Sequence, residues 1–171
     1  MNQELITYIV LGSHKRLKGL KLPISNHCEE FLSSNFGNKN TSETELNDLI
    51  TNSKGSLIVL LPPSSLPNKQ SKEALKKMSK IDISTWGWFE FNKNFNSNII
   101  QKFRKISAKV RSIPNLEQGI FFTKRLYFSV GGIGKLGESP FKEISKRFYS
   151  RFDPQKPLPA LIIRTKNLDI Y

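Results

Sequence analysis

Few side chains in the sequence could bind a metal ion or act as a nucleophile. The histidines and cysteine are limited to His14, His27 and Cys28, whereas a structural zinc site needs several His, Cys or carboxylate ligands close together. His27 and Cys28 are adjacent, so on a helix their side chains would diverge by about 100° and could not work as base and nucleophile. We therefore expect no metal, no cofactor and no enzyme activity.

One enzymatic alternative depends on His14. A histidine can act as a general base in RNA cleavage, and a neighbouring cation such as Lys15 or Arg16 can stabilise the developing charge. A small, metal-independent RNA-processing enzyme therefore stays open as an alternative function, and loss of RNA cleavage on His14→Ala would identify it.

A glycine-rich segment from Gly132 to Gly137 has the GxGxxG spacing of dinucleotide-binding loops. Such a loop must follow a strand and lead directly into a helix, whose N-terminus then meets the pyrophosphate. Here Ser139 and Pro140 begin a helix only after the last glycine, and the next acidic candidate, Asp153, precedes a proline-rich turn. We interpret the segment as a connecting loop.

Positive charge is the feature of the sequence that indicates function. The net charge is +13 and the isoelectric point is about 9.9. Residues 101–171 hold most of the excess, with fifteen Lys and Arg against five Asp and Glu. Because a folded protein gains nothing from such self-repulsion, the charge predicts a surface for an anionic partner: nucleic acid, an anionic membrane or an acidic protein.

The elements that must position these charges follow from hydrophobic periodicity and capping residues. Apolar runs rich in β-branched and aromatic residues predict strands over residues 4–11, 56–61, 83–91, 120–130 and 160–164. Capping residues and amphipathic spacing predict helices over residues 25–34, 69–80, 96–111 and 139–152, and a short helix from Ser42. Residues 14–21 read as an exposed turn and residues 62–68 as a surface connection. This order predicts a single α+β domain over residues 1–171, with helices packed on one mixed or antiparallel sheet of about five strands.

Cations are concentrated on the turn at residues 14–21, the helix at 96–111, the strand at 120–130 and the helix at 139–152. If these segments face the same way, they form one patch that contacts phosphates or lipid headgroups. The candidate residues for contact with an anionic partner are Lys15, Arg16, Lys18, Lys102, Arg104, Lys105, Lys109, Arg111, Lys124, Arg125, Lys142, Lys146, Arg147 and Arg151.

Two aromatic patterns accompany these charges. In the strand at residues 83–91, Trp86 and Trp88 share one face; they either stack on bases or lie at a membrane interface, or they form a pair in the core. In the helix at residues 139–152, the predicted buried stripe is Phe141, Ile144, Phe148 and Phe152.

The order of elements resembles the core of rhabdovirus-type matrix proteins. The segments that carry the resemblance are LITYIVL, SNHCEEFLSS, SLIVLL, STWGWFEF, KRLYFSV, SPFKEISKRF and ALIIRTKNLDIY. The lysine-rich N-terminal arm and the PPPY motif of the longer members do not occur, since Pro62 and Pro63 are followed by two serines. The resemblance implies a non-enzymatic structural protein that self-associates and bridges a nucleocapsid to the inner face of an anionic membrane. The main alternative is a sequence-tolerant RNA- or DNA-binding protein.

The sequence contains no segment that reads as a transmembrane helix. Its most apolar run, Leu57 to Leu61, ends at two prolines, far short of the roughly 20 residues that span a bilayer. The single cysteine and the lack of a signal-peptide core indicate an intracellular protein, either cytoplasmic or peripheral at a membrane. If the matrix resemblance holds, the virion is a further location.

Overall fold

The computed structural model describes residues 5–18, 20, 22–35, 42–63, 65–81, 83–91, 119–132 and 140–162. In chain order the elements are β1 (Ile6–Gly12), α1 (His14–Leu17), β2 (Glu29–Asn35), α2 (Ser42–Asn52), β3 (Leu57–Leu61), β4 (Ser65–Pro67), α3 (Lys69–Ser79), β5 (Trp86–Phe91), β6 (Ile120–Thr123), α5 (Lys124–Ser129), α6 (Pro140–Tyr149) and β7 (Leu158–Ile162). The helix predicted over residues 96–111 lies outside these ranges. So do the five candidate contact residues on it, Lys102, Arg104, Lys105, Lys109 and Arg111.

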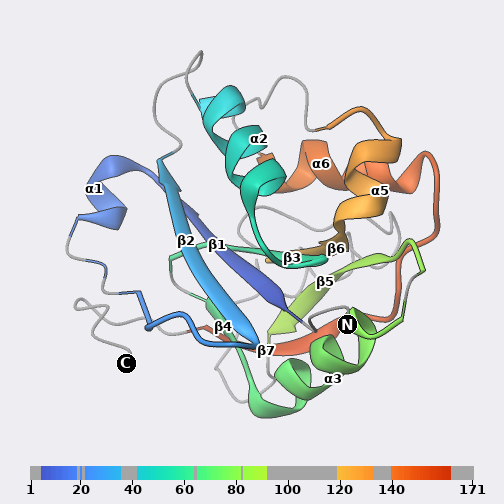
Figure 1. The fold of residues 1–171 in the computed structure, drawn as a ribbon, viewed down its shortest axis with the longest axis horizontal. Helices are drawn as coiled ribbons and strands as arrows, with labels where there is room; N and C mark the ends of the chain where they lie inside the picture. The colour runs from blue at the N-terminus through green and yellow to red at the C-terminus, as the bar shows by residue number, and fades with distance from the viewer. Residues whose placement is uncertain are drawn as a thin grey trace, which may run out of the picture.

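The strands form one mixed sheet in the order β2-β1-β3-β6-β5-β7-β4 (Figure 1). β1 pairs in parallel with β2 and β3, β6 runs antiparallel to β3 and β5, and β7 pairs in parallel with β5 and antiparallel with β4. The predicted α+β class with a single mixed sheet is confirmed, and the sheet has seven strands instead of about five.

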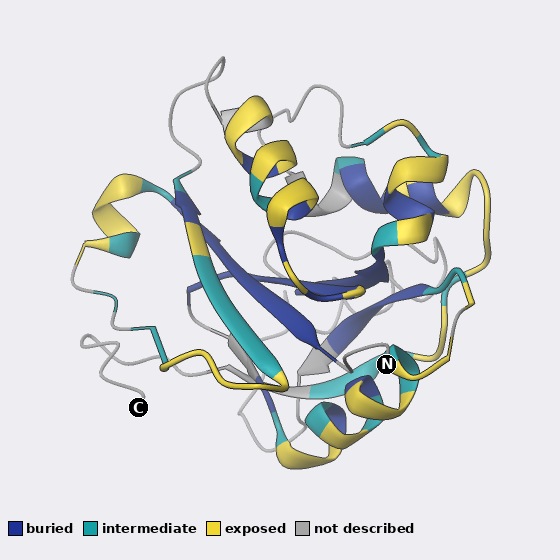
Figure 2. Ribbon diagram, in the orientation of Figure 1, coloured by how far each residue is buried: buried dark blue, intermediate teal, exposed yellow. Residues whose placement is uncertain are grey.

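Helices cover both faces of the sheet. Leu46 of α2, Leu126 of α5 and Phe148 of α6 belong to the core cluster on one face, whereas Leu75 of α3 belongs to the cluster on the other. In Figure 1, α2, α5 and α6 lie above the strands and α3 lies below them. β1 and β3 are buried along their whole length (Figure 2). Central strands buried on both faces need near-continuous apolar runs, which explains why β3 is entirely apolar and β1 is apolar apart from Thr7.

The strand β5 shows the period-two alternation that the sequence predicts. Trp86 and Trp88 are buried in the cluster beneath α5 and α6, and Phe89 is buried in the cluster against α3. The Trp86 indole N–H donates to the Phe152 carbonyl oxygen at 2.8 Å. Both tryptophans are therefore core residues, and neither is available at the surface for stacking on bases or for lying at a membrane interface.

The helix predicted over residues 25–34 is wrong, because β2 occupies most of that segment. The capping residues are real, but they form a turn: the Asn26 Oδ1 accepts from the Cys28 and Glu29 backbone N–H groups, and the Ser25 Oγ accepts from the Phe31 N–H. Such side chains favour turns as readily as helix starts. Seven residues then pair with β1, and the Phe31 ring stacks on Tyr8 at 5.0 Å, so tertiary pairing overrides the local signal.

The long strand predicted over residues 120–130 is also wrong after Thr123, where α5 begins. Its neighbours end at that point: Thr123 lies opposite Leu57, the first residue of β3, and Phe122 lies opposite Trp86, the first residue of β5. Without partner strands the chain turns into a helix, which buries Leu126 in the core. The candidate contact residues Lys124 and Arg125 thus open a helix instead of lying in mid-strand.

The first glycine of the GxGxxG segment helps to end α5. Gly131 and Gly132 have φ angles of 77° and 79°, and their N–H groups donate to the Phe128 and Tyr127 carbonyl oxygens, each at 3.1 Å. This is the Schellman arrangement of a helix C-terminus, which requires a left-handed residue that glycine adopts without strain. The segment therefore follows a helix, whereas a dinucleotide-binding loop must follow a strand.

Two smaller expectations also differ from the structure. Residues 62–68 were expected at the surface, but Pro62, Pro63 and Pro67 are buried and β4 pairs with β7. Phe152, expected in the buried stripe of the last helix, lies beyond α6 and is 44% exposed, whereas Ile144 and Phe148 are buried as predicted. The last helical turn rotates Phe152 to the border of the core.

Candidate anionic-partner surfaces

The first group of candidate cations lies on the turn after β1. Lys15 and Arg16 lie in the four-residue helix α1, Lys18 follows it, and all three are exposed. Close packing holds this turn at the carboxyl end of β1: a β-carbon on Gly12 would lie 2.7 Å from Cγ of Pro63. Of the exposed turn predicted over residues 14–21, residues 14–16 and 18 are exposed as expected, whereas Leu17 and Leu20 are half-buried and a short helix lies beside the parallel strands.

The histidine of the enzymatic alternative lies in the same turn. His14 is exposed, and its backbone carbonyl oxygen accepts from the Lys18 N–H at 3.0 Å. Within the described ranges, no group of three His, Cys, Asp or Glu side chains could hold a metal ion. The described helices include none that is long and apolar enough to span a bilayer.

The Lys124 side chain is half-buried and lies against the C-terminal end of α2. Its ammonium donates to the Thr51 and Ser53 carbonyl oxygens at 3.0 and 2.6 Å, at the C-terminus of α2. Burial lowers the pKa of Lys124, and the nearby Glu30 carboxylate opposes this shift. A cation at this position satisfies carbonyls that have no partner within the helix, so Lys124 is the least suited of the described candidates to contact a partner.

Glu30, the residue that attracts Lys124, belongs to a polar junction between three strands. The Thr7 hydroxyl and the Lys54 backbone N–H both donate to the Glu30 Oε2, at 2.7 and 2.9 Å. The Gly55 N–H in turn donates to the Thr7 Oγ1 at 3.0 Å. The junction links the amino-terminal ends of β1, β2 and β3, and its members are too far apart in sequence for local spacing to reveal it.

The remaining candidates lie on α5, on α6 and just beyond α6. Arg125 and Arg151 are exposed, and the Arg147 guanidinium donates to the Gly132 carbonyl oxygen at 3.4 Å. Lys146 forms a 3.1 Å ion pair with Glu143 one turn earlier, and both side chains are well exposed. Exposed pairs of this kind add at most about 1 kcal/mol, so the Lys146 charge remains accessible to a partner. Lys142 lies within α6.

The richest cationic face among the described elements is on α3, a helix whose lysines are not among the contact residues predicted from the sequence. It carries Lys69, Lys72, Lys76 and Lys77, with Lys80 at its C-cap, against a single acidic residue, Glu73. Leu75 and Ser71 are fully buried and dock the helix on the sheet, where the Ser71 hydroxyl bonds to the Pro159 carbonyl oxygen. The signal was present in the sequence as lysines at helical spacing opposite the apolar stripe.

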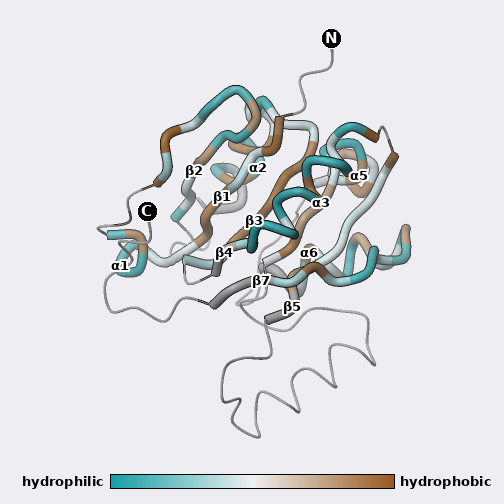
Figure 3. Tube along the Cα trace, turned by 90° about the horizontal axis from the view of Figure 1, so that it is seen from below, coloured by the Kyte–Doolittle hydropathy of each residue, from teal (hydrophilic) through white to brown (hydrophobic). Residues whose placement is uncertain are grey.

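The lysines of α3 differ in their surroundings. Lys72 is half-buried, with its Nζ 5.9 Å from the centre of the Tyr8 ring, which is a cation–π distance. Lys69, Lys76 and Lys77 are exposed, and no described carboxylate forms an ion pair with them. We call these three residues, together with Lys72 and Lys80, the α3 lysine face. Figure 3, seen from below, shows α3 as a mostly hydrophilic tube over the hydrophobic strands.

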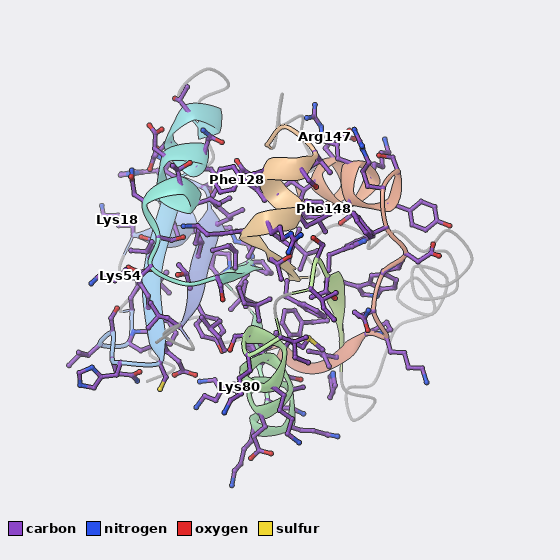
Figure 4. All side chains as sticks on the ribbon, turned by 45° about the vertical axis from the view of Figure 1, so that its right-hand side comes forward. Lys18, Lys54, Lys80, Phe128, Arg147 and Phe148 are labelled. Atoms are coloured by element: carbon purple, nitrogen blue, oxygen red, sulfur yellow. The ribbon has the colours of Figure 1, made fainter. Side chains whose placement is uncertain are left out.

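The described cations do not form the single patch that the sequence suggested. α1 contacts β1 and β2 at one end of the sheet, whereas Phe148 of α6 packs on Trp86 and Phe122 of β5 and β6. In Figure 4, Lys18 lies beside the β1–β2 end, Arg147 at the top and Lys80 at the bottom. The described part of the chain therefore presents three separate cationic surfaces.

Comparison with known proteins adds no assignment to these surfaces. No protein-family model and no curated protein sequence matches the chain.

Proposed function

We propose that the protein binds nucleic acid without catalysing a reaction, and that the α3 lysine face is its main contact with phosphates. The observation that carries this proposal is a row of exposed lysines on a rigidly docked helix. Lys76 and Lys80 lie about two and three helical turns after Lys69. The three side chains therefore point in nearly the same direction. At about 1.5 Å per residue the row is about 16 Å long, which is enough to follow several phosphates of one strand.

The electrostatics of α3 favour a functional role for these charges over a purely structural one. Lys69 and Lys72 lie in the first turn, which contains no acidic residue, although the positive end of the helix dipole disfavours cations there. Lys72 and Lys76 also repel each other at the i,i+4 spacing. Lys76 and Lys77 lie in the last turn, where the dipole favours cations, and Lys72 lies beside the Tyr8 ring. Lys69 is therefore the cation that helix stability explains least, and binding of an anionic polymer is the better account of its position.

The proposal predicts that neutralising Lys69, Lys76 and Lys77 to Gln weakens RNA binding and its dependence on salt. Each phosphate contact contributes about 0.7 to the slope of log K against log salt for single strands, so losing three contacts should reduce the slope by about 2. The measurement is fluorescence anisotropy of labelled RNA across a salt series, with the RNA checked on a gel for cleavage.

Two controls make this test specific to α3. Glu73 lies one turn from Lys69, Lys76 and Lys77, so Glu73→Gln should tighten binding by removing the one anion from the face. Lys54→Gln removes an exposed lysine elsewhere and should leave the affinity nearly unchanged. The proposal is wrong if Glu73→Gln has no effect, if Lys54→Gln weakens binding as much as each α3 change does, or if the RNA is cleaved and His14→Ala stops the cleavage.

A second candidate function is matrix-like bridging of a nucleocapsid and an anionic membrane, with self-association. It is favoured by the placement of the α3 lysine face and the cations of α6 on opposite faces of the sheet, since such a molecule can engage two anionic partners at once. Two of the seven segments behind the matrix resemblance have a different secondary structure, because SNHCEEFLSS contains β2 and KRLYFSV contains α5. Nucleic-acid binding therefore has the stronger support.

Co-flotation separates the two candidates. A bridging protein should carry labelled RNA to the top of a density gradient together with anionic vesicles, and should sediment as concentration-dependent multimers. A nucleic-acid-binding protein should leave both the RNA and itself at the bottom. Flotation of RNA with the vesicles would favour the matrix-like function.

A further inference from the structure

Two exposed aromatic side chains lie next to each other at the end of α6. The backbone bonds from Ser150 N–H to Lys146 O and from Phe152 N–H to Phe148 O continue the helical turn past Tyr149. Tyr149 and Phe152 are therefore three residues apart on one helical surface, where side chains are neighbours. They are 43% and 44% exposed, so each presents part of its ring to solvent.

Hydrogen bonds to a buried tryptophan fix the position of this turn. The Phe152 carbonyl oxygen accepts from the Trp86 indole N–H, and three residues later the Gln155 N–H donates to the Trp86 carbonyl oxygen at 2.7 Å. The ring of Phe148, which precedes Tyr149, packs on Trp86 with ring centres 5.7 Å apart. The backbone that carries the exposed rings is therefore held in place, which lowers the ordering cost of binding a ligand there.

A cation lies beside the two rings. Lys146 lies one turn before Tyr149, and its ion pair with Glu143 leaves both side chains well exposed. Arg151 is also exposed, but it is two residues after Tyr149 and one before Phe152, so its side chain diverges from both rings. We call Lys146, Tyr149 and Phe152 the α6 aromatic surface.

We propose that the α6 aromatic surface binds the unstacked bases of single-stranded nucleic acid, with Tyr149 and Phe152 as stacking groups and Lys146 as a phosphate contact. The inference rests on the proposed nucleic-acid-binding function and adds to it a preference for single strands over duplexes. Every base has a π-face that can stack on an aromatic ring, so such a surface tolerates any sequence. In a duplex the bases are already stacked on one another, so the protein should discriminate against duplexes.

The burial of the apolar side of α6 favours bases over lipid as the occupant. Ile144 and Phe148 are buried in the core, so of these apolar residues only the partly exposed rings of Tyr149 and Phe152 are open to a ligand. Stacking needs only an accessible ring face, whereas an interfacial membrane anchor needs apolar side chains that reach into the headgroup and acyl boundary.

The test compares the full chain with a Tyr149→Leu/Phe152→Leu variant, which keeps apolar bulk and removes both rings. The probes are labelled oligouridine, its duplex with oligoadenine, and anionic phosphatidylserine vesicles. We expect the variant to bind oligouridine about tenfold more weakly or worse, the range of base–aromatic stacking, and to bind the duplex within about twofold of wild type. Phe128→Leu, which changes an exposed phenylalanine on α5, should leave all three affinities unchanged. The fluorescence emission of the buried Trp86 and Trp88 checks that the core of each variant is intact.

The outcomes separate this inference from the function on which it rests. If the α3 lysine changes weaken the binding of oligouridine but the Tyr149→Leu/Phe152→Leu variant binds it as tightly as wild type, the nucleic-acid function stands and the stacking role is wrong. If Phe128→Leu loses as much affinity as the double variant, the assignment to α6 is wrong. If the double variant loses vesicle binding and keeps oligouridine binding, the surface is a membrane contact. If wild type binds neither oligouridine nor its duplex with oligoadenine, both proposals are wrong.

Discussion

Replacing Trp86 with alanine is expected to lower the free energy of unfolding by about 3–5 kcal/mol, the range for removing a large buried aromatic. The Trp86 side chain is fully buried, and its ring packs on Trp88 and Phe148 with ring centres 6.0 and 5.7 Å apart. The substitution also removes the indole N–H that bonds to the Phe152 carbonyl oxygen. It therefore leaves a cavity between β5 and α6 and frees the turn that carries the proposed stacking groups.

Chemical unfolding followed by far-ultraviolet circular dichroism measures this loss, because the signal does not depend on the tryptophan that is removed. For a chain of this size the melting temperature should fall by about 6–20 °C. Ile24→Ala is the matched control: Ile24 is 92% exposed, and surface substitutions usually change stability by no more than about 0.5 kcal/mol. A loss at Trp86 as small as that at Ile24 would contradict the core position of the tryptophan.

The parts of the fold that the sequence predicts well are those in which local pattern and tertiary environment agree. β3 is apolar throughout and β1 is apolar apart from the buried Thr7, because both faces of these strands are buried, and α3 has one apolar stripe because only one side meets the sheet. The alternation of Trp86, Trp88 and Phe89 likewise follows from the period of two along a strand. In each case a few neighbouring residues carry enough information to fix the element.

The errors lie where distant residues decide the local structure. Asn26 caps a turn instead of a helix because the residues after it pair with β1, more than twenty positions earlier. Lys124 begins a helix because the partners of β6 end at Leu57 and Trp86, which lie far away in the chain. Neither condition can be read from the residues of the segment itself, since strand pairing is a non-local property.

The sequence predicts which residue types form the candidate surfaces but not where they lie. Net charge directs attention to cationic residues, yet it cannot show that the Lys124 ammonium is bonded to the C-terminus of α2. It also cannot show that α3 presents its lysines on a face of the sheet opposite to α6. The helix predicted over residues 139–152 already places Tyr149 and Phe152 three residues apart, but it assigns Phe152 to the buried stripe, and only the structure shows that Phe152 is exposed.

Replacing Gly55 with alanine is expected to destabilise the fold by about 3–5 kcal/mol, because overpacking and a lost buried hydrogen bond act together. A β-carbon on residue 55 would lie 2.6 Å from the Leu5 carbonyl oxygen and 2.7 Å from both the backbone nitrogen and the Oγ1 of Thr7. Two of these atoms are backbone atoms at the start of β1, so they cannot move aside as a flexible side chain would. Relief of the clash must lengthen the bond from the Gly55 N–H to the Thr7 Oγ1 and disturb the polar junction at Glu30.

Gly131→Ala separates this steric effect from the backbone preference of glycine. Gly131 has a φ of 77°, but nothing lies within 4 Å of the position of its β-carbon, so alanine there meets only the left-handed backbone cost of about 1–2 kcal/mol. The same denaturant titration should rank Gly55→Ala well below Gly131→Ala in stability. Thr7→Val, which removes the hydroxyl without adding bulk, should fall between them, because it leaves the Gly55 N–H unsatisfied in a buried position. Equal stabilities for the two alanine variants would mean that the amino-terminal ends of β1 and β3 are not as closely packed as this junction requires.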